Sequence, residues 1–147
     1  MPLINVPIQQ GGAIANALVG VSQARAQALI AAGQTVPAPV TGTFLIDTGA
    51  TSTCVDAALI AGLGLPLIGR VMMQTPSTAG VPVACDQFDA SFYIPGAAPD
   101  AMLVIPALPL MAVTLAPQGI HGLIGRDILD RCMVTYHGPA RFVTIAH

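Results

Sequence analysis

Lysine, glutamate and tryptophan are absent from this 147-residue chain, and aromatic and charged residues make up only 4% and 8% of it. The five arginines are scattered along the sequence and form no cluster, and the net charge is −2 at pH 7. A nucleic-acid surface needs clustered positive charge and aromatic rings for base stacking, so this composition argues against nucleic-acid binding. With 54% hydrophobic residues, the chain is too apolar for global disorder and is expected to bury an aliphatic core.

Cysteine is also scarce. Cys54, Cys85 and Cys132 leave at least one thiol unpaired, and the sequence contains no Cys-x-x-C and no Cys/His spacing typical of zinc. We therefore expect three buried thiols in a reducing compartment, a cytoplasmic location, and no metal or other cofactor.

Two uncharged stretches, up to Ala24 and from Ala101 to Gly125, are the candidates for a membrane span, and the N-terminus lacks the basic region of a signal peptide. The second stretch contains three prolines, which interrupt a spanning helix. We expect no integral membrane segment, with peripheral membrane contact as the weaker alternative.

The predicted elements are short and are separated by glycine and proline. Strands are predicted at 3–8, 43–46, 71–93 (a hairpin), 122–125 and 133–147 (two strands), and one or two strands broken by Pro106 and Pro109 are predicted at 102–115. Residues 13–21 fit a strand or a helix, and short helical segments are expected at 22–32, 56–63 and 126–132. This pattern predicts one all-β domain over residues 1–147, a small closed or partly closed barrel.

The sequence FLIDTGATSTCV, residues 44–55, places a carboxylate directly after a buried strand. Burying such a charge is costly unless hydrogen bonds or chemistry use it. Gly49 permits close approach of the backbone, and Thr48 brings a hydroxyl group beside Asp47. Asp47 is therefore the first candidate for a functional residue.

The Asp-Thr-Gly-Ala run resembles the active-site motif of the retropepsin-like (retroviral-type) aspartic protease family. Residues 121–129, HGLIGRDIL, resemble the second signature of that family, in which an apolar strand ends in Gly and an Arg opens a helix. A predicted hairpin with a PSTAG turn separates the two motifs, where the family carries its flap. The resemblance covers residues 43–147, and the long segment before the motif is typical of cellular or bacterial members.

The resemblance implies an acid-protease fold with a flap and one short C-terminal helix near 126–132. It also implies an aspartic endopeptidase that cleaves peptides or proteins without metal or cofactor. Because the chain has one Asp-Thr-Gly, the active site requires a homodimer, with Asp47 from each copy sharing a proton. The resemblance also implies roles for further residues. Residues expected to bind the substrate or support its binding are Thr48, Gly49, Ala50 and the flap residues Ser77, Thr78, Ala79 and Gly80. Gly125 and Arg126 are expected to have a structural role.

The sequence departs from the viral pattern after Ala50. Acidic residues commonly follow that position in viral enzymes and pair with the late Arg, whereas Thr51 and Ser52 stand here. We expect Arg126 to bind Asp127, Asp130 or a backbone carbonyl instead. Asp127 is expected to favour the start of its helix through the macrodipole.

Two other functions remain open from sequence. One is a catalytically inactive, retropepsin-shaped dimerisation or binding module, since an intact Asp-Thr-Gly is necessary but not sufficient for activity. The other is a phosphate-binding hairpin of the kind found in sugar kinases and actin-like ATPases, although that fold needs far more than 147 residues.

Overall fold

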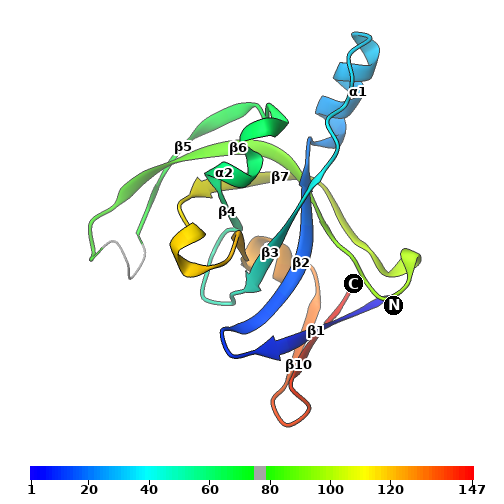
Figure 1. Ribbon diagram of the computed structural model, residues 1–147, viewed down its shortest axis with the longest axis vertical. Helices are drawn as coiled ribbons and strands as arrows, with labels where there is room; N and C mark the ends of the chain where they lie inside the picture. The colour runs from blue at the N-terminus through cyan, green and yellow to red at the C-terminus, as the bar shows by residue number, and fades with distance from the viewer. Residues whose placement is uncertain (75–78) are drawn as a thin grey trace.

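The computed structural model of the chain describes residues 1–74 and 79–147 (Figure 1). Its strands are β1 Leu3–Gln9, β2 Gly12–Gly20, β3 Val40–Ile46, β4 Cys54–Asp56, β5 Leu67–Met73, β6 Val83–Ile94, β7 Leu103–Val113, β8 Gly122–Ile124, β9 Met133–His137 and β10 Phe142–Ala146. Its helices are α1 Gln23–Ala31, α2 Ala57–Ile60 and α3 Arg126–Leu129, with 3-10 turns at Ala61–Leu63, Pro99–Ala101 and Ala116–Gln118.

The strands form one sheet in the order β5-β6-β7-β4-β8-β3-β2-β1-β10-β9, and an additional pairing of β6 with β2 closes six of these strands into a ring. This confirms the predicted all-β closed architecture. Beyond the ring, β5 and β6 extend as a hairpin at the left of Figure 1, and β1, β10 and β9 form a terminal sheet that includes both ends of the chain.

The interior of the ring is mainly aliphatic, as the lack of aromatic residues predicts. Its two aromatic residues, Phe44 of β3 and Phe92 of β6, are fully buried and meet edge to face with ring centroids 5.0 Å apart. Packing of this kind fixes β3, the strand that leads to Asp47, against the opposite side of the ring.

Local sequence patterns predicted most of the elements. Residues 13–21, which left strand and helix open, form β2, and Ser22 caps α1 by accepting a hydrogen bond from the N–H of Arg25 at 3.2 Å. The C-terminal helix is shorter than predicted, because α3 ends at Leu129 and the chain reaches Cys132 through a turn.

The prolines do not divide residues 102–115 into two strands, which was one of the two alternatives left open. β7 is one strand of 11 residues, and its pairing with β6 shifts register between Ala90 and Phe92, opposite Pro106. A proline lacks the N–H that a regular ladder needs, and a bulge relieves that requirement.

The 22–39 segment between β2 and β3 forms α1 and an extended return, and α1 projects from the top of the molecule in Figure 1. Within the described parts of the chain, no helix is long and apolar enough to cross a membrane.

Candidate active site

Asp47 lies where β3 leaves the sheet. β3 runs parallel to β8, and the ladder continues one step beyond the strand, because the N–H of Asp47 donates to the carbonyl of Ile124 at 3.0 Å. The Asp47 side chain is half-buried. The paired strands therefore hold its backbone while part of the carboxylate stays accessible to solvent.

The tight turn after Asp47 also orients the carboxylate. The N–H of Gly49 donates to Asp47 Oδ1 at 2.9 Å, and the N–H of Ala50 donates to the Asp47 carbonyl at 3.2 Å. A Cβ atom at position 49 would lie 3.1 Å from the same carboxylate oxygen, a tight contact that would press on the Asp47 side chain. Thr48 and Gly49 are exposed, and Ala50 is half-buried.

Arg126, the first residue of α3, binds this loop with its side chain and its backbone. Its guanidinium donates from Nη1 to the Thr48 carbonyl at 3.1 Å and from Nη2 to Thr51 Oγ1 at 3.3 Å. Its backbone N–H donates to the carbonyl of Ala50 at 2.9 Å. The predicted backbone-carbonyl partner is confirmed, and a hydroxyl group takes the place that an acidic residue has in viral enzymes.

Asp127 has a larger role than the predicted helix-start residue. It does accept a hydrogen bond from the N–H of Ile128 in α3, but its carboxylate also reaches back to the loop. Oδ2 accepts from the N–H of Thr53 at 2.9 Å, and Oδ1 accepts from the Thr53 hydroxyl at 2.6 Å. The hydroxyl in turn accepts from the N–H of Gly125 at 3.1 Å, so a hydrogen-bond chain joins Thr53, at the end of the loop, to Gly125 and to Asp127 of α3.

Gly125 permits this close contact. A Cβ atom at this position would lie 2.5 Å from the carbonyl carbon of Ser52 and 2.7 Å from its oxygen. No side chain fits at such distances, so the glycine of the predicted second motif is needed for α3 to pack against the Asp47 loop.

A second carboxylate, Asp56, anchors the far end of the segment that follows the loop. It is the N-cap of α2, because Oδ1 accepts from the N–H of Ala58 at 3.0 Å. Oδ2 accepts from the N–H groups of Leu115 and Ala116 at 2.7 and 2.8 Å. These backbone hydrogen bonds, that of Leu115 foremost, lower the pKa of Asp56 below its ordinary value.

The β5–β6 hairpin occupies the place of the predicted flap. Val71 pairs with Cys85, and Met73 with Val83, so these four side chains share one face. The opposite face carries the ion pair of Arg70 with Asp86 at 2.8 Å.

The tip of this hairpin is described only in part. Of the predicted flap residues, Ala79 and Gly80 are exposed and adopt positive φ angles of 51° and 78°. Gln74 Nε2 donates to the Gly80 carbonyl at 2.7 Å. Ser77 and Thr78 lie outside the described residues.

The three thiols lack the lowered pKa that a nucleophilic cysteine needs. Burial, with a smaller contribution from the Asp127 charge, raises the pKa of Cys54 to about 12. Burial also raises the pKa of Cys85 and of Cys132. Over residues 1–74 and 79–147, no group of three or more His, Cys or Asp side chains is placed to hold a metal ion.

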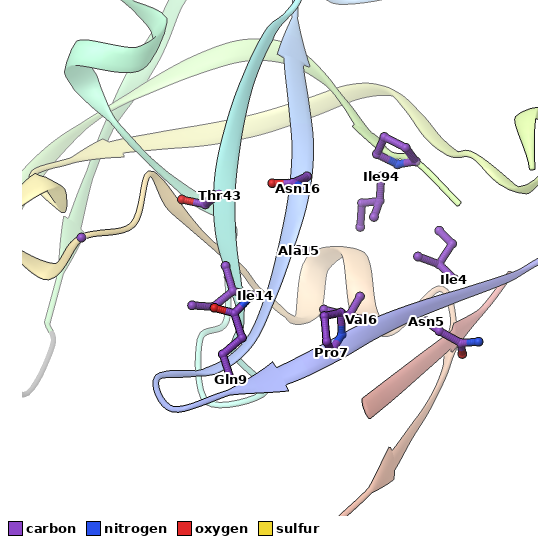
Figure 2. Close-up of a pocket in the computed structure, with 12 residues that line it drawn as sticks. Ile4, Asn5, Val6, Pro7, Gln9, Ile14, Ala15, Asn16, Thr43 and Ile94 are labelled. Carbon is purple, nitrogen blue, oxygen red and sulfur yellow. The ribbon is translucent and has the colours of Figure 1, made fainter. Parts of the chain in front are cut away.

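Two shallow hollows lie outside the Asp47 loop. One, of about 420 Å³, opens where β1 diverges from β2, and Val6 and Pro7 on β1 and Ala15 on β2 are among the residues that line it (Figure 2). The other, of about 430 Å³, lies between α2 and the 116–121 segment. Asp47 lines neither of them.

The structure brings together Asp47, Thr48, Gly49, Ala50, Gly125 and Arg126, which were predicted from two motifs far apart in the sequence. Sequence reasoning missed the contributions of Thr51, Thr53 and Asp127. The one available signal was Asp127 itself, a charged residue within the second motif in a chain with few charges.

Comparisons with known proteins agree with this arrangement. A sequence model described as aspartyl protease matches residues 26–128. The fold is similar to that of a retropepsin-like aspartic protease from Rickettsia conorii, with a TM-score of 0.57 and 14% identity over 97% of this chain and 89% of that one. A search of curated proteins gives no match. The first motif and all but the last residue of the second fall within the matched residues, and the two meet in space as described above. The chain therefore belongs to the aspartyl protease family, and its fold is retropepsin-like.

Proposed function

We propose that this protein is an aspartic endopeptidase whose active site forms between two copies of the chain, each contributing Asp47. The observation that carries the proposal is the position of Asp47. It follows a buried parallel strand, its Oδ1 is oriented by the Gly49 N–H at 2.9 Å, and its loop is held by Arg126 and Asp127.

One carboxylate cannot act as both acid and base in the same step. Two carboxylates at close distance share one proton, because both cannot be ionised together. The sequence has a single Asp-Thr-Gly, and a two-fold axis beside the exposed Thr48 and Gly49 would supply the second.

The proposed reaction is hydrolysis through activated water. The ionised Asp47 takes a proton from water, whose oxygen attacks the carbonyl carbon of the peptide bond. The protonated Asp47 of the other copy donates its proton to the carbonyl oxygen, which gives a neutral tetrahedral intermediate. Collapse of this intermediate with proton transfer to the nitrogen breaks the C–N bond, and no covalent bond to the enzyme forms.

The neighbouring residues support this chemistry in defined ways. Thr48 is exposed and available to hydrogen-bond the opposite loop, and the exposed Gly49 leaves room for the substrate backbone. The apolar face of the hairpin, with Val71 and Met73, would cover hydrophobic side chains of the substrate and exclude water.

The experiment is cleavage of a diverse peptide library between pH 4 and 7, read by mass spectrometry for the wild type and Asp47→Asn. Asp100→Asn, which changes an exposed carboxylate on the Pro99–Ala101 turn, is the matched control. We expect the wild type and the control to produce the same cuts and Asp47→Asn to produce none, with an optimum at acidic to near-neutral pH. Cleavage that survives in Asp47→Asn would refute the proposal, and a wild-type dimer that cleaves nothing would favour the inactive binding module.

A further inference from the structure

We propose that the hollow between β1 and β2 binds an extended, uncharged peptide segment of a partner protein, which pairs with a free stretch of the β2 edge. One edge of β2 pairs with β3 from Ile14 to Val19. The other edge pairs with β1 up to Ala13 and with β6 from Leu18 onward. Residues 14–17 have no strand partner on this second edge within the described parts of the chain, and the hollow of about 420 Å³ opens there.

Two prolines account for this interruption. Extending the β1–β2 register by one residue places Pro7 opposite Ile14, and extending the β2–β6 register by two residues places Pro95 opposite Asn16. Proline has no N–H to donate to a ladder, so regular pairing ends on both sides of the gap. β1 then diverges from β2 and pairs through its other edge with β10 (Figure 2).

The backbone groups of Ile14 and Asn16 point into this gap. The hydrogen bonds of Thr43 establish the direction, because its carbonyl accepts from the N–H of His121 at 2.8 Å and its own N–H donates to His121 Nδ1 at 3.0 Å. Thr43 thus directs its backbone groups toward the β8 side of β3. Asn16 lies opposite Thr43, and in an antiparallel ladder the two residues of such a pair direct their backbone groups away from each other. Asn16, and Ile14 two residues before it, therefore present two N–H and two carbonyl groups to the gap.

The lining of the hollow identifies the class of ligand. It contains no charged residue, so an ion or a charged side chain would find no opposite charge there. The apolar side chains of Ile4, Val6 and Ile94 and the amides of Asn5 and Asn16 are among the groups that line it (Figure 2). An added strand is the ligand that satisfies N–H and carbonyl groups repeating every two residues, a mode of binding known as β-augmentation. An extended segment with valine and threonine side chains meets both requirements.

The free edge is short, so the expected complex is weak. Residues 14–17 span about 13 Å at ~3.3 Å per residue, which accommodates roughly four residues of an added strand. Asp47 does not line the hollow, so a segment bound there lies outside the proposed catalytic site. Such a segment would anchor a partner protein to this domain whether or not the domain is a protease.

The first test is an NMR titration of the nitrogen-15-labelled full chain with the blocked peptide acetyl-Ser-Val-Thr-Val-Gln-amide. The chain carries Asp47→Asn, which prevents cleavage of the peptide. We expect saturable shifts of the amide signals of Ile14 and Asn16. The same peptide with its internal backbone nitrogens methylated, or with aspartate in place of its threonine, should bind at least tenfold more weakly. Equal binding by the methylated peptide, shifts confined to the Asp47 loop, or no binding at all would overturn the proposal.

A proline substitution tests the same edge from the protein side. Asn16→Pro removes an N–H that points into the gap and takes no part in the β2–β3 ladder, so we expect a folded variant with at least tenfold weaker peptide binding. Asn16→Ala is the matched control, because it keeps the N–H and should bind the peptide as the parent chain does. Undiminished binding by Asn16→Pro would overturn the proposal, and the methylated peptide still decides if that variant does not fold. Shifts of the Ile14 and Asn16 signals with protein concentration alone would overturn the peptide assignment in favour of a second copy of the chain.

Discussion

The carboxylate of Asp127 holds Thr53 by two hydrogen bonds, one to its N–H at 2.9 Å and one to its hydroxyl at 2.6 Å, across 74 residues of sequence. Thr53 is fully buried, so neither donor can turn to water if the carboxylate is lost. This relationship, with the side chain of Arg126, ties the short α3 to the loop that carries Asp47.

Replacement of Asp127 by alanine should destabilise the protein by about 2–3 kcal/mol, because buried donors left without an acceptor each cost about 1–3 kcal/mol. Urea unfolding measures the change. Thr53→Val removes the hydroxyl, and the double variant should lose less stability than the sum of the two single variants. Strict additivity would contradict the proposed coupling.

Gly125→Ala should cost about 2–4 kcal/mol, because the new Cβ would lie 2.5 Å from the Ser52 carbonyl carbon and one element must shift. Gly62→Ala is the control, since nothing lies within 4 Å of a Cβ at that position. The control should change the urea midpoint little or raise it slightly. Equal effects of the two substitutions would show that the predicted close contact does not exist.

Asp56 should make the protein less stable in acid. Hydrogen bonds from the N–H groups of Leu115, Ala58 and Ala116 lower its folded-state pKa. Its contribution to stability is therefore complete above the unfolded value of about 4, and it is lost as the pH falls through the lower folded pKa.

Asp56→Asn tests this linkage. The variant should be less stable than the wild type at pH 7, and the difference between their free energies of unfolding should narrow below about pH 4. Asp100→Asn, at an exposed position, serves as the control, and its free energy of unfolding should change with pH as that of the wild type does. A difference between Asp56→Asn and the wild type that stays constant down to pH 2 would argue against the Asp56 contacts.

The three thiols should react with iodoacetamide in order of their exposure. Burial raises the pKa of Cys54 to about 12, so almost no thiolate forms there at pH 8, whereas Cys132 is only half-buried. Peptide mass spectrometry after timed alkylation should show Cys132 modified first and Cys54 modified only on unfolding in urea. Early modification of Cys54 in the native protein would mean that the β4 region opens readily.

Much of the site could be predicted from sequence because its parts are local. A buried strand followed by Asp-Thr-Gly defines a turn in which the Gly49 N–H reaches Asp47, and the apolar-Gly-Arg run defines where β8 ends and α3 begins. Gly125 marks a position where a side chain would collide, and a Cβ atom at position 49 would be in tight contact with Asp47 Oδ1, at 3.1 Å.

The sequence by itself determined the all-β class, the identity of the candidate acid and the two segments that form its surroundings, because strand patterning, turn chemistry and capping act within a few residues. Only the tertiary structure decided that Thr51 and Thr48 accept hydrogen bonds from Arg126, that Asp127 accepts hydrogen bonds from Thr53, and that β7 continues through its prolines. The contacts of Arg126 and Asp127 join α3 to the loop after β3, which is far away in the sequence. Their donors and acceptors meet only when the sheet has curved into its ring, a geometry that no local pattern encodes.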